Sequence, residues 1–152
     1  MQTFNRILAA VDGSESSIWA VRTAAGLAKS TGARLTILHV ISFPGEAYSS
    51  GYPSASSGEK KARESAEKYV LIAKEASEEL GVVSSSIIID DLESAVRGIT
   101  EYASENGVDL IVTGTRSLGG FKRRLLGSVS NGVVGNARCS VLVVKDGRPD
   151  EA

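Results

Sequence analysis

The chain has 152 residues, of which 42% are hydrophobic and 23% are charged, a composition typical of a globular protein rather than of a disordered or membrane-embedded one. This length fits one compact domain over residues 1–152 and needs no second domain. The formal net charge of −1 gives no general attraction to nucleic acid or to an anionic membrane, so we expect neither as a partner.

The N-terminal residues and the cysteine content indicate the compartment. The first residues do not resemble a signal peptide, and no apolar run approaches the roughly 20 residues that span a bilayer. The single cysteine, Cys139, allows no disulfide within the chain and precedes an apolar run, so we expect a packed thiol. These features favour a cytoplasmic location.

Five short apolar runs alternate with segments of helical period. This order is typical of a parallel sheet with helices on both faces. It predicts an α/β fold: an open, doubly wound, Rossmann-like sheet of five parallel strands in the order 3-2-1-4-5. The predicted strands are Arg6 to Val11, Arg34 to Val40, Ser86 to Ile89, Asp109 to Thr113 and Ser140 to Val144.

Four helices are predicted, one between each pair of successive strands. Their ends follow from capping residues: Ser14 begins the first helix, and Gly32, Gly81 and Asn106-Gly107 end the first three. The predicted spans are Ser14 to the Gly32 turn, about Glu59 to Leu80, about Glu93 to Glu105, and Val129 to Arg138. The stripes expected to be buried are Ile18, Val21, Ala25 and Ala28; Ala62, Ala66, Tyr69, Ala73, Ala76 and Leu80; and Ala95, Val96, Ile99 and Ala103.

Two segments are expected to lack regular structure. Residues 42–58 are rich in Ser, Gly and Pro, and a loop this long is either disordered or functional. If the loop is ordered, Phe43, Tyr48 and Tyr52 could close over a ligand or pack on a neighbouring subunit. Residues 146–152 form a short polar tail that we expect to be mobile.

Residues 112–128 have the features of a phosphate site. A strand ends at Gly114, and a basic, glycine-rich loop leads to Gly127-Ser128 at the start of the fourth helix. Free N–H groups at a helix N-terminus favour an anion, and glycine lets the backbone approach it closely. Glycine here can also mark only a turn, and Ser128 can serve only as a helix cap.

In a doubly wound sheet, ligands bind where the strand order reverses, here between the first and fourth strands. The first strand ends in Ala10-Val11-Asp12, next to the candidate phosphate loop. The Asp12 carboxylate could accept hydrogen bonds from a sugar hydroxyl or an adenine amino group, or help to hold a cation. It could also cap the turn before the first helix, and the two roles can coexist.

The same region resembles the nucleotide motif of the universal stress protein family: Gly, two residues, Gly, nine residues, then Gly and Ser or Thr. Gly114, Gly127 and Ser128 match this motif, whereas Ser117 stands where the second glycine is usual. Similar family segments occur at residues 11–17, 38–41, 107–112 and 139–145, so the resemblance covers about residues 4–145.

The resemblance to the ATP-binding members implies a cofactor and its site. It implies ATP, or AMP or ADP, with Mg²⁺ as an optional companion. Ala10, Val11 and Asp12 would lie beside adenine and ribose, and the Val40 backbone would contact the base. The ribose and phosphate path would be lined by Gly114 and Arg116, with Ser117 as the member that departs from the motif, and the phosphates would be held by Gly127, Ser128, Val129 and Ser130.

The resemblance also implies a homodimer through the last strand, Val141 to Lys145, whose apolar edge needs covering. The leading hypothesis is a regulatory, stress-response protein whose nucleotide state alters its binding to an unknown protein partner. A dimeric interaction module without nucleotide binding is one alternative, motivated by Ser117. A slow ATP-cleaving enzyme is another, although the sequence has no P-loop and no evident general base beyond Asp12.

The remaining polar residues are assigned structural roles. His39 lies within an apolar strand and is expected to be a satisfied core residue. Lys122, Arg123 and Arg124 form a basic cluster that is either solvated or paired with phosphate. No Cys/His cluster predicts a metal site, and Asp90-Asp91 with Glu93 are expected to end a strand and cap the third helix. Trp19 is expected at a surface seam.

Overall fold

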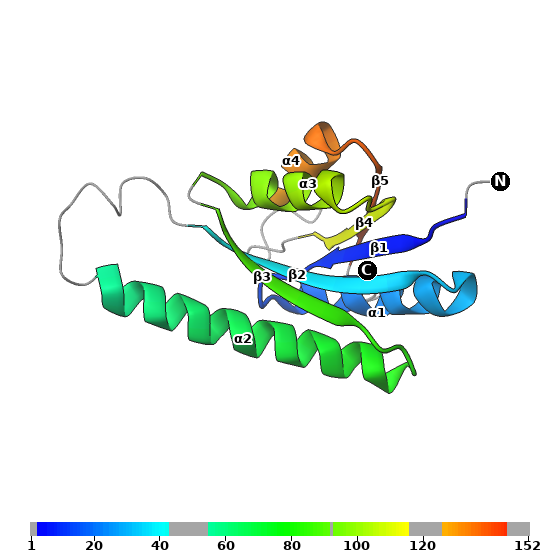
Figure 1. Ribbon diagram of the computed structural model, residues 1–152, viewed down its shortest axis with the longest axis horizontal. Helices are drawn as coiled ribbons and strands as arrows, with labels where there is room; N and C mark the ends of the chain where they lie inside the picture. The colour runs from blue at the N-terminus through cyan, green and yellow to red at the C-terminus, as the bar shows by residue number, and fades with distance from the viewer. Residues whose placement is uncertain (1–2, 43–54, 92, 116–125, 146–152) are drawn as a thin grey trace, which may run out of the picture.

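The computed structural model describes residues 3–42, 55–91, 93–115 and 126–145. These residues form a five-stranded, wholly parallel sheet in the order β3-β2-β1-β4-β5, which confirms the predicted fold class (Figure 1). The strands are β1 (Arg6–Ala10), β2 (Arg34–Ser42), β3 (Ser85–Asp91), β4 (Leu110–Gly114) and β5 (Ser140–Val144). Each predicted strand end lies within two residues of the observed one.

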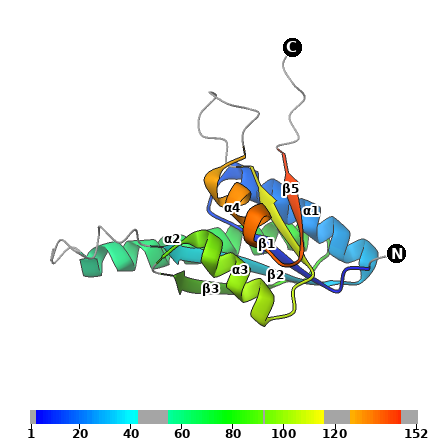
Figure 2. The same ribbon diagram turned by 90° about the horizontal axis from the view of Figure 1, so that it is seen from above.

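Two helices cover each face of the sheet (Figures 1 and 2). One face carries α1 (Glu15–Thr31) and α2 (Ala55–Glu79), and the other carries α3 (Ala95–Glu105) and α4 (Ser128–Asn136). Helix α2 begins before Glu59, so it takes residues 55–58 out of the predicted loop. The rest of that loop after Ser42, and the predicted tail, lie outside the described residues.

The helix ends follow the local capping rules. Ser14 is the N-cap of α1 and accepts a hydrogen bond from the Ser17 N–H, and Gly32 closes the helix with φ 75°. Strand β3 ends at Asp91 as expected, but helix α3 begins at Ala95, two residues later than predicted, and its N-cap is Ser94 and not the predicted acidic residues. The reason is the Asp91 carboxylate, which accepts the Glu93 and Ser94 N–H groups in a turn before the helix.

The core divides into two clusters because successive residues of a buried strand point to opposite faces. Ile7, Ala9 and Val11 pack under α1 and α2, while Leu8 and Ala10 pack under α3 and α4. Most of the predicted stripes are buried or half-buried. The prediction that Leu80 is buried is wrong, since this residue is 39% exposed. Helix α2 ends at Glu79, and Leu80 lies in the turn that Gly81 makes with φ 77°.

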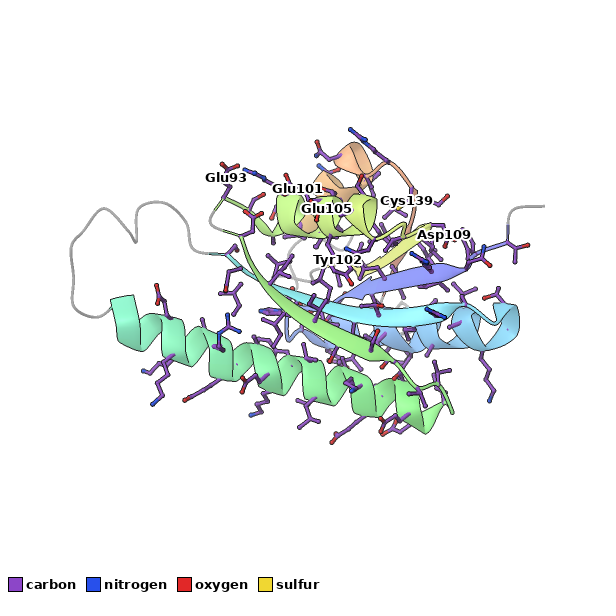
Figure 3. All side chains as sticks on the ribbon, in the orientation of Figure 1. Glu93, Glu101, Tyr102, Glu105, Asp109 and Cys139 are labelled. Carbon is purple, nitrogen blue, oxygen red and sulfur yellow. The ribbon has the colours of Figure 1, made fainter. Side chains whose placement is uncertain are left out.

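Polar contacts tie down the end of the sheet opposite to the strands' carboxyl ends. The carboxylate of Asp109, which is labelled in Figure 3, accepts the N–H groups of Asn5 and Arg6 at 2.8 and 3.1 Å, and this joins the start of β4 to β1. Cys139, before β5, is half-buried as expected, and burial raises the pKa of its thiol. The Asp109 contacts thus join β1 and β4, two of the strands whose carboxyl ends form the site.

The surface shows one expected feature and one further finding. Trp19 is half-buried on α1, as predicted, with the Arg22 guanidinium 5.6 Å from its ring. Among the described residues, no helix combines the length and apolar character needed to cross a membrane.

Candidate functional site

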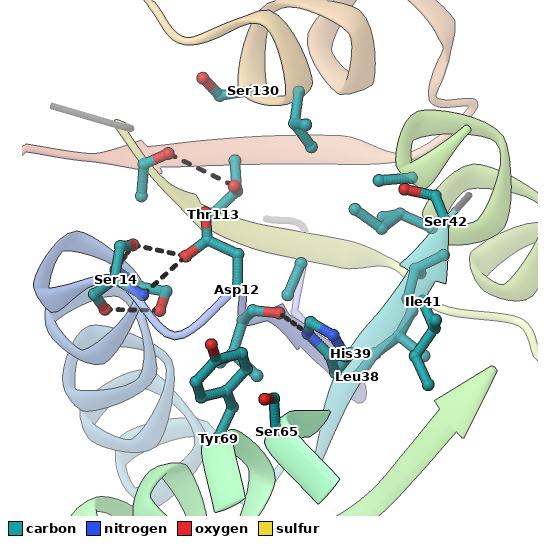
Figure 4. A pocket seen from close by; sticks show the side chains of 18 of the residues that line it. Asp12, Ser14, Leu38, His39, Ile41, Ser42, Ser65, Tyr69, Thr113 and Ser130 are labelled. Atoms are coloured by element: carbon teal, nitrogen blue, oxygen red, sulfur yellow. Dashed lines mark hydrogen bonds between the residues drawn. The ribbon is translucent and has the colours of Figure 1, made fainter. Parts of the chain in front are cut away.

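A cavity of about 440 Å³ opens at the carboxyl ends of β1, β2 and β4, at the predicted switch point (Figure 4). Helices α1, α2, α3 and α4 complete its walls. The lining residues are Ala10, Val11, Asp12, Ser14 and Ser17; Leu38, His39, Val40, Ile41 and Ser42; Ala62, Ser65 and Tyr69; Ala95 and Ile99; Thr113 and Gly114; and Val129 and Ser130.

The turn between β1 and α1 presents Asp12 to this cavity. The Asp12 carboxylate accepts the Ser14 N–H at 2.9 Å and the Ser14 hydroxyl, so it also orders the turn, as the alternative role predicted (Figure 4). Gly13 follows with φ 86°, and a Cβ built there would meet the Tyr69 ring at 2.5 Å. The turn therefore needs glycine both for its backbone angle and for its contact with α2.

A second wall is formed where β1 ends before β2. The Val11 N–H still donates to the Leu38 carbonyl at 2.9 Å, but β2 continues to Ser42 while β1 ends at Ala10. The His39 ring reaches back, with Nδ1 2.7 Å from the Val11 carbonyl oxygen, and packs edge-on to Tyr69 with centroids 5.5 Å apart (Figure 4). His39 is hydrogen-bonded as expected, but it is half-buried and lines the cavity instead of lying in the core, which the sequence did not indicate.

The first turn of α4 forms a third wall. Gly127 is its N-cap, with φ −60° and ψ 160° and no side-chain cap, so the alternative that Ser128 caps the helix is wrong. Ser130 is buried, and its hydroxyl donates to the Gly127 carbonyl at 3.1 Å. The first N–H groups of an α-helix have no acceptor within the helix, which leaves this end suited to an anion.

Gly114 has a packing role that the motif did not reveal. A Cβ there would lie 2.5 Å from the carbonyl oxygen and 2.7 Å from the carbonyl carbon of Ser16. Ser16 is itself buried, and its hydroxyl donates to the Thr115 carbonyl. Gly114 therefore lets the first turn of α1 pack directly on β4.

The structure brings most of the predicted site residues together. Seven of them line the cavity, while Gly127 and Ser128 lie at the start of α4 and are not among its lining residues. Arg116, Ser117 and the basic cluster at 122–124 lie outside the described residues. The seven are Ala10, Val11, Asp12, Val40, Gly114, Val129 and Ser130.

Sequence reasoning missed the wall that α2 provides. Ala62 and Tyr69 were assigned to the buried stripe of this helix, and Ser65 was not singled out. All three face the cavity because they lie at i, i+3 and i+7 in the part of α2 that passes the carboxyl end of β2. A serine on an otherwise alanine-rich stripe was the available signal.

Carboxylates are scarce in this cavity. Within the described ranges, Asp12 is the only acidic residue that lines it, and no group of three or more His, Cys, Asp or Glu residues is placed to hold a metal. The polar surface consists instead of hydroxyls, backbone groups and one imidazole. Such a lining suits an organic ligand that carries its own charge.

The fold and the cavity together define an open, doubly wound α/β protein with a ligand-type pocket at its topological switch point. The model of the Universal stress protein family matches residues 3–145. A universal stress protein of Staphylococcus aureus (strain USA300) is 36% identical over 147 residues, which cover 95% of this chain and 86% of that protein. This chain belongs to the universal stress protein family.

Solved structures agree with this assignment. The structure of hypothetical protein MJ0577 has 26% identity and a TM-score of 0.79, covering 97% of this chain and 100% of that one. A universal stress protein in complex with cAMP has 25% identity and a TM-score of 0.65, covering 94% and 98% of the two chains.

Proposed function

We propose that the cavity binds an adenine nucleotide: ATP, or AMP or ADP. The observation that carries the proposal is the joining of three walls, the Val40 strand end, the Asp12 turn and the α4 N-terminus, around about 440 Å³. Base, sugar and phosphate each need one such wall. The similar protein that was solved with cAMP supports an adenine nucleotide over other ligands.

Each wall of the cavity contacts a different part of the nucleotide. The Val40 backbone contacts the base, the Asp12 carboxylate accepts from ribose hydroxyls, and the N–H groups at the start of α4 hold phosphate. The described residues fit Mg²⁺ only as an ion that arrives with the nucleotide, because Asp12 is the one carboxylate among those of them that line the cavity. The metal would neutralise phosphate charge.

Isothermal titration of the nucleotide-stripped protein with ATP and AMP, with and without Mg²⁺, tests the proposal. Ser65→Trp should abolish binding, because Ser65 is half-buried and faces the cavity from α2. Glu64→Trp is the matched control, since the neighbouring Glu64 is exposed and does not line the cavity. Saturable binding by the wild type and by Glu64→Trp alone would support the site.

If the titration shows no saturable binding at about millimolar nucleotide, the binding free energy is weaker than about −4 kcal/mol, and this result would refute the proposed nucleotide site. The chain would then be treated as an interaction module of the same fold. Equal loss in both tryptophan variants would point to a damaged helix α2 instead of a blocked cavity.

The proposed function includes a cytoplasmic homodimer that pairs through β5. This strand lies at the edge of the sheet, and four of its five residues are half-exposed. Leu142 and Val144 pack against one core cluster and Val141 against the other, whereas Val143 belongs to neither. Val143→Lys should therefore give a monomer by light scattering, while Val83→Lys, at a site that is 88% exposed, should not.

The nucleotide is proposed to regulate a protein partner through this dimer. Helix α4 supplies Val129 and Ser130 to the cavity, and the chain reaches β5 four residues after the helix ends. Bound phosphate would stabilise the first turn of α4, and this would alter the stability of the edge strand β5 that follows the helix. Amide hydrogen exchange in β5 with and without nucleotide measures this coupling, and equal protection in both states would contradict it.

A further inference from the structure

The ladder between β1 and β2 stops one hydrogen bond short of its expected length. In a parallel pair, alternate residues of a strand direct both N–H and C=O to the same neighbour. The Leu38 carbonyl accepts from Val11, so Leu38 and Val40 direct their backbone groups towards β1. The next link would join the Val40 N–H to the Val11 carbonyl, and these two residues form no such bond.

The His39 side chain forms the hydrogen bond to the Val11 carbonyl that the Val40 N–H does not form. Its Nδ1 lies 2.7 Å from the Val11 carbonyl oxygen. A carbonyl can only accept, so Nδ1 carries the proton and the bond satisfies the carbonyl that the ladder leaves behind. The Val40 N–H remains directed at the end of β1, and Val40 lines the cavity there.

Tyr69 of α2 supports the ring and the adjoining turn. It contacts His39 edge-on, at 5.5 Å between centroids and 70° between planes. It also fills the space where Gly13 lacks a side chain, since a Cβ there would lie 2.5 Å from the ring. One side chain therefore packs on both His39 and the turn that carries Asp12 (Figure 4).

We propose that His39 is a positioning residue for the ligand: by occupying the Val11 carbonyl, it keeps the Val40 N–H available to the ring of a bound nucleotide. This role rests on the proposed nucleotide function. His39 acts through Val11 and Val40, and the same bond fixes Val11 directly before Asp12. Without the imidazole, the Val40 N–H is expected to close onto the Val11 carbonyl and complete the ladder.

The first arm of the test compares His39→Leu with His39→Asn by titration with adenosine and AMP. An Asn amide nitrogen can replace Nδ1–H, whereas Leu offers no donor. We expect His39→Leu to raise Kd by roughly tenfold for both ligands, the effect of losing about one hydrogen bond, and His39→Asn to stay within about threefold. Equal losses in both variants, in step with lowered thermal stability, would mean a structural role only and overturn the proposal.

The second arm uses no ligand. Amide hydrogen exchange of Val40 should be fast in the wild type and in His39→Asn, and slower in His39→Leu, where the ladder closes. If His39→Leu does not fold, His39→Gln replaces it, because its longer side chain moves the donor away from the Val11 carbonyl. Unchanged Val40 exchange among the folded proteins would overturn the proposal. A wild type that binds no nucleotide, but shows the expected exchange, would refute the nucleotide function and retain the His39 contact.

Discussion

The strand-end wall and the α4 wall of the cavity are built in different ways. At the strand ends, Val40 offers a backbone N–H whose direction is set by sheet pairing, while the His39 ring occupies the Val11 carbonyl. At α4, the backbone groups point into solvent or ligand because a helix begins after Gly127. The first wall depends on residues distant in the sequence, and the second depends on one local turn.

The two motif glycines show the same contrast. Gly114 is required by a backbone contact with Ser16, which is 98 positions away in the sequence. Gly127 has φ −60° and ψ 160°, a conformation open to any residue. One glycine is thus needed to assemble the sheet and helix that form the cavity, and the other serves the helix start.

The largest effect is expected at Gly114. Gly114→Ala places a methyl group against the Ser16 backbone, which cannot move without displacing α1, so the free energy of unfolding should fall by about 3 kcal/mol. Urea denaturation measures the loss. Gly135→Ala is the control, because no atom lies within 4 Å of a Cβ at this position in α4, and it should gain about 0.5 kcal/mol. A mild Gly114→Ala would show that the glycine serves only the ligand.

A second pair of glycines isolates the contact between Tyr69 and the Asp12 turn. Gly13 and Gly32 have similar positive φ angles of 86° and 75°, but only Gly13 faces a ring. Gly32→Ala should cost about 1 kcal/mol, the price of a left-handed alanine, and Gly13→Ala about 2 kcal/mol. The excess should vanish in a Tyr69→Leu background, as a double-mutant cycle would measure. If the extra cost of Gly13→Ala stays unchanged in that background, the contact with Tyr69 is not its cause.

The α4 wall is tested by Gly127→Ala. Since the backbone angles suit alanine, the loss of stability should stay near 0.5 kcal/mol, the difference between glycine and alanine as an N-cap. If the wall holds phosphate, AMP should bind about threefold to tenfold more weakly, because an added methyl group hinders close approach of the anion to the helix N-terminus. Adenosine, which lacks phosphate, should bind as before. An equal loss for both ligands would contradict the assignment of separate walls.

The sequence predicts features that depend on neighbouring residues. Ser14 and Gly32 mark the ends of α1 because a cap and a left-handed glycine act locally. The apolar runs predict the strands because two-sided burial leaves little alternative. The prediction that Leu80 is buried is wrong because the spacing of apolar residues does not show by itself where the helix ends.

The missed features depend on contacts distant in the sequence. The apolar run around His39 indicates a strand, but where β1 ends relative to β2 depends on how the chain turns at Gly13 against Tyr69. The same reason hides the Ser16 contact of Gly114 and the α2 wall at Ser65. Sequence patterns therefore located the cavity and seven of the residues that line it, whereas tertiary contacts decide the rest of the lining and which backbone groups face the cavity.

Asp91 provides a matched turn outside the cavity. Asp91 is the last residue of β3, and Asp12 follows shortly after β1. Each carboxylate accepts the N–H of the residue two positions later, from Ser14 and from Glu93, and Asp91 also accepts the Ser94 N–H. Asn can keep these turns and loses only the charge. Asp12→Asn should therefore weaken nucleotide binding while Asp91→Asn leaves it unchanged, as titration would show. Equal weakening would mean that turn charge, and not ligand contact, matters at both sites.

The smallest effect concerns stability against pH at Asp91. The hydrogen bond from the Ser94 N–H holds the pKa of this carboxyl below its ordinary value of 3.8, so the ionised form is favoured in the folded chain. The resulting stability is present above about pH 3.8 and is lost as the pH falls through the folded pKa. Asp91→Asn should cost no more than about 0.5 kcal/mol near neutral pH, because solvent screens the site. Urea denaturation of both proteins from about pH 7 to about pH 2 should show this difference disappear at the acid end, and a constant difference would assign it to the turn geometry instead of the charge.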